Sequence, residues 1–276
     1  MQDEVKIAGS QVHRLTSETI DQPYLINVAT PPSYNATGKP CPVVYVTDGG
    51  PAFLALSAVV PMLQLAGELK PFITVGMTYD VENSMDAMTL RTRDLTHCAG
   101  DMVMDPESTP EWMKKLPVAK PGGAANFLEF INGQVKPLIQ QHYNTAPDED
   151  IYAGYSLGGL FGLYTLFNKP DSFNRYVIGS PSIWWNKKDI LTHEQSYSES
   201  HRDLNASVYL SAGRLEESEK KPDQYGMVSN LLALVKTLEA RKYEHLNLTH
   251  QVIADETHMS CHPVALVRGL RKVIGH

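Results

Sequence analysis

The chain has 276 residues and carries 24 lysines and arginines against 31 aspartates and glutamates, a formal net charge of −7 at pH 7. Hydrophobic residues make up 42% and charged residues 20%, as in an ordinary globular protein. This composition excludes collagen-like, disordered and disulfide-scaffold proteins, and a chain of this length buries a large core without a metal or a disulfide. The acidic balance argues against a nucleic-acid partner, because such proteins need a basic face.

The cysteines and the apolar stretches bear on the compartment. Cys41, Cys98 and Cys261 are an odd number and too few for a disulfide framework, which favours a reducing compartment. The most apolar stretch, residues 52–69, is interrupted by proline and glycine, so we expect no membrane partner. No signal peptide is visible, and we expect a cytoplasmic protein, or a periplasmic or secreted one if a leader has been removed. The oligomeric state is left open.

The hydrophobic pattern predicts strands that alternate with helices. In chain order the predicted elements are a strand at 43–47, a helix at 52–69, a strand at 72–78, an irregular segment at 79–123, a helix at 124–143 kinked at Pro137, a strand at 150–154, a helix at 157–168, strands at 175–179 and 207–212, a helix at 227–241, a strand at 246–253 and a helix at 263–274. Repeated units of this kind predict an α/β fold, with a mostly parallel central sheet and helices on both faces. In such a sheet the ligand site lies beyond the carboxyl ends of the strands.

The irregular segment at 79–123 is rich in Asp, Met, Pro and Thr. A segment that long inside a compact domain is usually a lid or a binding loop. We therefore expect residues 1–276 to form a single domain in which this lid sets substrate specificity.

A candidate nucleophile lies between a predicted strand and a predicted helix. Residues 154–158 read Gly-Tyr-Ser-Leu-Gly and fit the pattern G-x-S-x-G. That pattern needs a sharp turn that lifts the serine hydroxyl out of the sheet, and small residues must flank the crowded turn. Gly154, Gly158 and Gly159 supply that room. The helix N-terminus behind Ser156 also favours negative charge, so the sequence predicts Ser156 as a nucleophile.

The base is sought among ten histidines. In folds with this motif the acid and then the histidine follow the serine along the chain. His258 follows the last predicted strand, so its loop can return an imidazole to Ser156 and accept the hydroxyl proton. His262 is the nearest rival, but its position beside Pro263 favours a capping or surface role.

The acid should follow a strand between the serine and the histidine. Residues 213–217 follow the predicted strand 207–212 and contain Glu216 and Glu217. Either carboxylate can hold the His258 tautomer and stabilise the imidazolium, and we favour Glu216. A solvated acidic run remains the structural alternative.

An oxyanion hole needs two backbone amides. One is the amide of Leu157, the residue after the nucleophile. The other should come from residues 48–51, directly after the first predicted strand, and we choose Gly50 because Pro51 has no N–H. A simple glycine turn is compatible with the same residues.

At this point the chain resembles a known family. The likeness runs from about Val12 to the C-terminus and is to the α/β-hydrolases of the Putative esterase group, which includes the esterase D-like enzymes and the siderophore (enterobactin, bacillibactin) trilactone esterases. The matching segments are 45–49 (YVTDG), 91–96 (RTRDLT), 154–159 (GYSLGG), 180–185 (SPSIWW), 213–216 (GRLE) and 256–258 (ETH).

The resemblance implies an α/β-hydrolase fold with Ser156 as nucleophile, Glu216 as acid and His258 as base. It also implies that the Gly50 and Leu157 amides bind the oxyanion, and that neither a metal nor another cofactor is needed.

Arg91, Trp184 and Trp185 are weaker candidates for substrate contact. The resemblance implies that Arg91 meets an anionic or phenolic group, whereas an Arg91–Asp94 brace inside the lid is the plainer interpretation. The paired tryptophans offer aromatic walls, although such pairs more often pack in a core or at a rim. One departure from the family is visible, because residues 97–98 are His-Cys where relatives carry proline.

The sequence therefore predicts a serine ester hydrolase that works through an acyl-enzyme on a small-molecule carboxylic ester. A siderophore lactone, a phenolic ester and a short acyl ester remain open as substrates. Two alternatives are an acyltransferase that uses the same acyl-enzyme and a non-catalytic binding module on a hydrolase scaffold. A metal site at His258, Cys261 and His262 is disfavoured, because no Glu follows His258 and no second ligand cluster is present.

Overall fold

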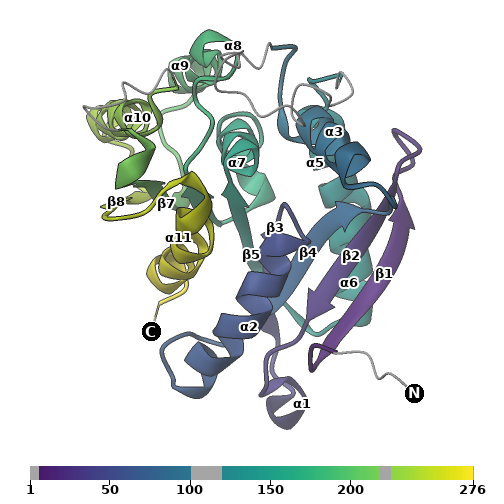
Figure 1. Cartoon of the computed structure of the whole chain (residues 1–276). Helices are drawn as coiled ribbons and strands as arrows, with labels where there is room; N and C mark the ends of the chain where they lie inside the picture. The colour runs from purple at the N-terminus through teal and green to yellow at the C-terminus, as the bar shows by residue number, and fades with distance from the viewer. Residues whose placement is uncertain (1–5, 101–119, 218–224, 276) are drawn as a thin grey trace.

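The computed structural model describes residues 6–100, 120–217 and 225–275. An eight-stranded sheet crosses the molecule in the order β1-β2-β4-β3-β5-β6-β7-β8 (Figure 1). The strands are β1 (Ser10–Thr16), β2 (Pro23–Ala29), β3 (Cys41–Val46), β4 (Ile73–Tyr79), β5 (Thr145–Tyr155), β6 (Arg175–Gly179), β7 (Ala206–Gly213) and β8 (Leu246–Ile253). The β1–β2 and β2–β4 pairs are antiparallel and the other neighbours are parallel, which confirms the predicted mostly parallel sheet.

Helices lie on both faces of this sheet (Figure 1). They are α1 (Tyr34–Thr37), α2 (Pro51–Leu65), α3 (Ser84–Leu95), α5 (Ala124–Phe130), η1 (Ile131–Val135), α6 (Lys136–His142), α7 (Leu157–Asn168), η2 (Pro170–Ser172), α8 (Trp185–Lys188), α9 (Ile190–Ser200), η3 (Arg214–Glu216), α10 (Met227–Arg241) and α11 (His258–Val273). No helix within the described ranges is both long enough and apolar enough to cross a membrane.

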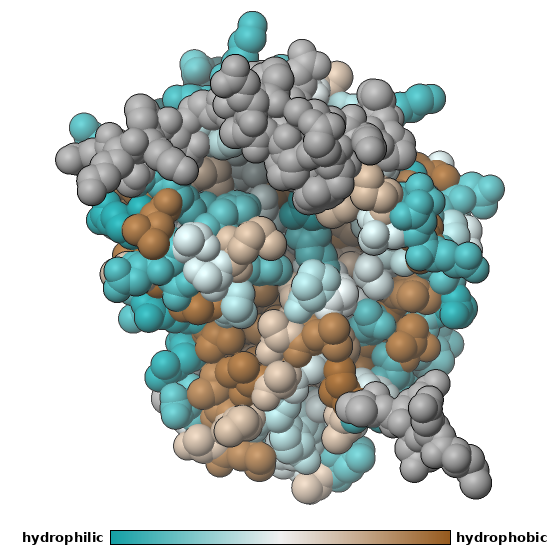
Figure 2. Space-filling view, in the orientation of Figure 1, coloured by the Kyte–Doolittle hydropathy of each residue, from teal (hydrophilic) through white to brown (hydrophobic). Residues whose placement is uncertain are grey.

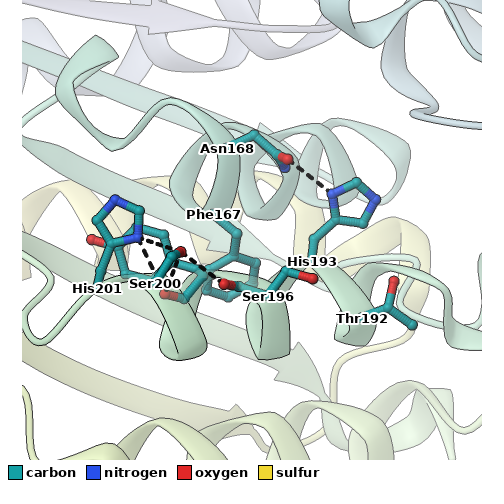
Figure 3. A pocket seen from close by; sticks show the side chains of 8 residues that line it. Phe167, Asn168, Thr192, His193, Ser196, Ser200 and His201 are labelled. Carbon is teal, nitrogen blue, oxygen red and sulfur yellow. Dashed lines mark hydrogen bonds between the residues drawn. The ribbon is translucent and has the colours of Figure 1, made fainter.

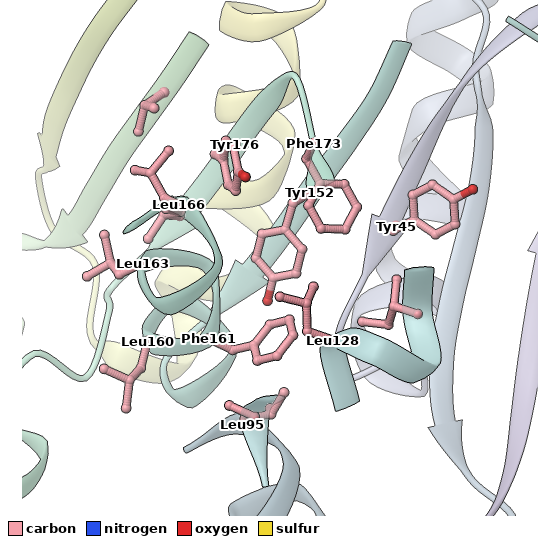
Figure 4. Packing of buried hydrophobic residues seen from close by; sticks show 14 of the residues in the cluster. Tyr45, Leu95, Leu128, Tyr152, Leu160, Phe161, Leu163, Leu166, Phe173 and Tyr176 are labelled. Carbon is pink, nitrogen blue, oxygen red and sulfur yellow. The ribbon is translucent and has the colours of Figure 1, made fainter. Parts of the chain in front are cut away.

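The alternation of side chains along the strands divides the core in two. On β3, Val43 and Tyr45 belong to the larger cluster under α5, α6, α7 and α10, whereas Val44 and Val46 belong to the cluster under α2 and α11. The centre of the larger cluster is aromatic, with the Tyr152 ring 5.4–5.7 Å from neighbouring phenylalanine rings (Figure 4). Each large side chain buried in this way contributes about 1.5–3 kcal/mol, so the central strands are held from both faces.

The kink expected at Pro137 is spread over a π-helical turn. Residues Ile131–Val135 form η1, and the Lys136 amide donates to the Ile131 carbonyl five residues earlier. Proline has no N–H and its ring crowds the carbonyl four residues before it, so the helix opens by one residue there. The predicted single helix is therefore α5, η1 and α6 in sequence.

Several elements of the structure are not among the predicted ones. β1 and β2 form an antiparallel pair at one edge of the sheet. β2 is not among the predicted strands, although Tyr24, Ile26 and Val28 show the buried alternation typical of a strand. Part of the segment 79–123 that we predict as irregular is helix α3. The residue before it, Asn83, caps this helix with a side chain that accepts from the Met85 amide at 2.9 Å. Its mostly polar surface gives no strong apolar period, which is why the pattern misses it. Residues 101–119 of that segment lie outside the described ranges.

The outer side of α2 is unusually apolar. Leu54, Met62 and Leu65 are 57%, 71% and 77% exposed. Figure 2 shows hydrophobic side chains gathered over this helix. Only the opposite side of α2, with Leu56 and Val60, packs into the core.

Candidate active site

Ser156 forms the turn between β5 and α7. Its backbone has φ 60° and ψ −119°, a conformation that is strained for any residue with a Cβ and costs about 1–3 kcal/mol. Neighbouring backbone holds it there, because the Ser156 amide donates to the Gly179 carbonyl at 3.0 Å. Its own carbonyl accepts from the Leu160 amide at 2.9 Å and from the Ser182 amide at 3.1 Å. The serine side chain is thereby raised at the carboxyl end of the sheet.

The glycines around Ser156 lie where there is no room for a side chain. A Cβ at Gly154 would overlap the Tyr152 hydroxyl, and a Cβ at Gly158 would overlap the Thr47 side chain. A Cβ at Gly159 would lie 2.8 Å from a carbonyl oxygen of β6. The packing on Gly158 also brings the loop after β3 directly against the start of α7.

Ser156, His258 and Glu216 are brought together by the fold. The Ser156 Oγ lies 3.1 Å from His258 Nε2, and His258 Nδ1 lies 2.6 Å from Glu216 Oε2. The His258 side chain is 39% exposed and the Glu216 side chain 1% exposed. A backbone hydrogen bond of 2.9 Å from Leu215 to Glu256 ties together the loops that carry the acid and the histidine. Each imidazole nitrogen therefore has one partner, as proton transfer from a serine requires.

The Glu216 carboxylate is held by more than His258. Its Oε1 accepts from the Gly213 amide at 2.7 Å and from the Ser180 hydroxyl at 2.5 Å. Burial raises the pKa of Glu216, but the hydrogen bonds from His258 and Ser180 outweigh burial and lower this pKa below its ordinary value. Ser180 follows β6 directly, and its position at a strand end is the sequence signal that could have found it.

Tyr155 supports the histidine from the strand side. Its hydroxyl donates to the His258 carbonyl at 2.7 Å, and its ring stacks on His262 with centroids 4.7 Å apart. His262 lies inside α11, so the capping role expected for it is wrong. Thr257 caps this helix instead, accepting from the Ser260 amide at 3.3 Å, because α11 begins five residues before the predicted start.

The structure separates the two candidate acids. Glu217 accepts from the Val228 amide at 2.9 Å and from the Ser229 amide at 2.7 Å. These are free donors in the first turn of α10, where a carboxylate is favoured by the helix dipole. Glu216 contacts the histidine, and Glu217 holds the start of a helix.

The loop after β3 presents the amide chosen for the oxyanion. Gly49 is already engaged, since its amide donates to the Met77 carbonyl at 2.9 Å. Gly50 is the next residue, and a Cβ there would meet nothing within 4 Å, so the space beside its Cα is open. Within the described residues, the amides of Gly50 and Leu157 donate no hydrogen bond, which leaves both available to an oxyanion.

The partner of Arg91 is Asp48, so the expected Arg91–Asp94 brace is wrong. Arg91 Nε lies 2.5 Å from Asp48 Oδ1, and its Nη2 lies 2.8 Å from Oδ2. Asp94 is instead bound by Arg93, at 2.6 Å, and by the Tyr24 hydroxyl, at 2.5 Å. Asp48 has φ 58° and directly precedes the Gly49–Gly50 turn, so the pair braces this turn.

The two tryptophans have different surroundings. Trp185 is 1% exposed, and its Nε1 donates to the Cys98 carbonyl at 3.2 Å. This burial contradicts the substrate contact considered for Trp185. Trp184 is only half-buried, with its ring 4.6 Å from the Tyr225 ring.

Several known proteins are similar to this chain in sequence and in fold. The profile of the family described as Putative esterase matches residues 17–251. The chain belongs to this esterase family. The ferri-bacillibactin esterase BesA of Bacillus subtilis (strain 168) is 29% identical over 274 residues, which cover 96% of this chain and 89% of that protein.

Two further known proteins are similar to this chain over most of its length. The siderophore triacetylfusarinine C esterase of Aspergillus fumigatus is 32% identical over 208 residues, covering 71% of this chain and 65% of that protein. The crystal structure of the BES protein from Bacillus cereus has 26% identity and a TM-score of 0.82, and each chain is covered completely. These likenesses confirm the α/β-hydrolase fold and the assignment as a carboxylic ester hydrolase.

Proposed function

We propose that this esterase hydrolyses the ester bonds of siderophores, with Ser156 as nucleophile, His258 as general base and Glu216 as the supporting acid. The observation that carries the proposal is the continuous chain of contacts from Ser156 Oγ through both imidazole nitrogens to a buried carboxylate. The names of the similar proteins support the substrate class, since two of them are esterases of named siderophore compounds.

The first half of the reaction forms an acyl-enzyme. The Ser156 Oγ attacks the ester carbonyl carbon while His258 Nε2 takes its proton. The negative charge that develops on the carbonyl oxygen is stabilised by the Gly50 and Leu157 amides. His258 then gives the proton to the leaving alkoxide, and an alcohol departs.

The second half releases the acid. Water attacks the acyl carbon while His258 takes a proton from it; the tetrahedral intermediate then collapses, the bond to Ser156 Oγ breaks, and His258 gives the proton to that oxygen. Glu216 remains a carboxylate throughout, because its hydrogen bonds keep its pKa low, and it stabilises the imidazolium at each step.

A panel of esters tests the proposal. Wild-type protein and Ser156→Ala are incubated with ferric bacillibactin, ferric triacetylfusarinine C and p-nitrophenyl butyrate, and products are followed by liquid chromatography and mass spectrometry. We expect wild-type kcat/KM to be highest for one of the two siderophores, with no turnover of any substrate by the variant.

The outcomes of this panel separate the substrate from the mechanism. Preference for p-nitrophenyl butyrate over both siderophores would reject the substrate class and leave the serine mechanism standing. Unchanged turnover by Ser156→Ala would reject the mechanism. Neither the acyltransferase nor the binding-module alternative is favoured, because the similar proteins carry esterase names.

A further inference from the structure

A second group of metal-ligating side chains lies where the chain leaves α3 and meets α9. His97 follows the end of α3, Asp189 directly precedes α9, and His193 lies in the first turn of that helix. These three residues each offer one ligand atom, and all three atoms lie within 4.8 Å of one another.

The spacing around Asp189 suits a bound cation. The His97 Nε2 lies 3.2 Å from Asp189 Oδ2, and the His193 Nε2 lies 3.8 Å from the same oxygen. In a tetrahedral zinc site with bonds of about 2.0–2.1 Å, ligand atoms are separated by about 3.3 Å. Two of the three separations are thus within about 0.5 Å of those in a metal site, and small side-chain rotations would close the third.

A contact on the ring nitrogen away from Asp189 orients His193. Its Nδ1 lies 3.0 Å from the amide oxygen of Asn168 (Figure 3). The Nε2 of the same ring faces the Asp189 carboxylate, so a cation between that nitrogen and the carboxylate would contact both. A hydrogen bond at the outer nitrogen is the usual support of a metal-binding imidazole.

His97 is buried at the cluster. Its side chain is 1% exposed, and its ring stacks on Tyr164 with centroids 6.0 Å apart. Its Nδ1 has no partner within the described residues. Because an outer-nitrogen partner is typically worth a factor of 10–100 in affinity, we expect binding weaker than in a fully supported site by about that factor.

We propose that His97, Asp189 and His193 form a binding site for one divalent ion of the zinc type. The site is open on one side, since the Asp189 and His193 side chains are 35% and 25% exposed. A metal there would link the end of α3 to the start of α9, far along the chain from each other. The site uses none of Ser156, His258 and Glu216, so its existence is independent of the proposed ester hydrolysis.

Metal binding is measured on the full, tag-free chain. Equilibrium dialysis against Zn²⁺, followed by elemental analysis, gives the number of ions bound, and Co²⁺ titration reports tetrahedral geometry through visible absorption. We expect one equivalent of bound zinc and an intense Co²⁺ spectrum. A hundredfold excess of Zn²⁺ over the dissociation constant should raise the melting temperature by about 5 °C.

Matched variants decide where the ion binds. His193→Asn removes a ligand whose side chain is 25% exposed, and His245→Asn removes a surface histidine that pairs with Asp203 and belongs to no metal-ligating group found among the described residues. We expect the bound equivalent, the Co²⁺ spectrum and the melting shift to disappear in His193→Asn and to persist in His245→Asn. The same stoichiometry and melting shift in wild type and His193→Asn would overturn the proposal, as would the absence of bound zinc in the wild type.

Discussion

The Arg91–Asp48 pair is the contact whose removal best tests how the site is built. Both side chains are largely buried, with exposed fractions of 18% and 12%, and the contact is bidentate. The perturbation is Arg91→Met, which keeps most of the apolar stem and removes the charge, with Asp48→Asn and the double variant completing a cycle.

The stability cost follows from the charge left behind. Removing one partner of a fully buried ion pair costs about 3–5 kcal/mol. Since Arg91 and Asp48 are partly exposed, water screens the stranded charge, and we expect Arg91→Met to lose about 2–3 kcal/mol of unfolding free energy. For a chain of this length that is a fall of about 4 °C in melting temperature.

The loss of activity expected for Arg91→Met follows from the position of Asp48. Asp48 holds φ 58° at the entrance to the Gly49–Gly50 turn, so a released carboxylate lets that turn relax. Complete loss of one oxyanion donor costs about 10²–10³ in kcat, and a displaced Gly50 amide should cost about 10- to 100-fold. KM should change far less, because Arg91 is bound to Asp48 and not to substrate.

Urea unfolding followed by circular dichroism measures the stability change, and p-nitrophenyl butyrate hydrolysis measures kcat and KM. The matched control is Arg14→Met, which breaks an ion pair with Asp80 whose side chains are 72% and 32% exposed. That surface pair should contribute less than about 1 kcal/mol and leave kcat unchanged. Equal losses in Arg91→Met and Arg14→Met would refute the reasoning from burial. A loss confined to KM would instead show that Arg91 contacts substrate.

Four further outcomes are expected. Ser156→Ala should lower kcat by about 10⁴–10⁶ and abolish labelling by a fluorophosphonate probe, with the urea midpoint retained; labelling elsewhere would point to another nucleophile. Glu216→Gln should lower kcat at least about 100-fold, whereas Glu217→Gln should cost about 1 kcal/mol of stability through weaker capping and leave kcat intact; the reverse pattern would exchange their roles. Because the pKa of Glu216 is lowered in the folded protein, its ionised carboxylate stabilises the fold above the ordinary pKa, and this stabilisation is lost as the pH falls through the folded value. The unfolding free energy of Glu216→Gln should therefore decline less steeply on acidification than that of the wild type. Parallel curves of unfolding free energy against pH would contradict this. Gly158→Ala should destabilise the protein by more than about 2 kcal/mol through its overlap with Thr47, and an unaltered urea midpoint would argue against that packing.

Much of the fold was predictable because the central strands are buried on both faces. Their short apolar runs stand out from the helical periods between them, and the predicted bounds of 157–168, 175–179, 227–241 and 246–253 agree with the structure. Polar or exposed elements lack that contrast. β1 lies at the sheet edge and α3 buries only Asp94 and Leu95, so tertiary contacts rather than local pattern determine them.

The sequence by itself determined the local geometry around Ser156. A strand, a crowded glycine turn and a helix within one short stretch allow few backbone arrangements, and their chemistry is visible without any partner. The sequence also reduced the candidate acids to Glu216 and Glu217, but adjacent residues point in different directions, and only the tertiary structure shows that Glu216 is the one in contact with His258.

Long-range pairings needed the structure for the same reason. Arg91 binds Asp48 rather than Asp94, Ser180 reaches Glu216, and Trp185 turns into the core. Each pairing joins segments that the sheet order brings together, and neither spacing nor residue type encodes that order locally. Structure that depends on residues close together in the sequence could be predicted. Which of several chemically equivalent residues become partners depends on the packing of the whole sheet.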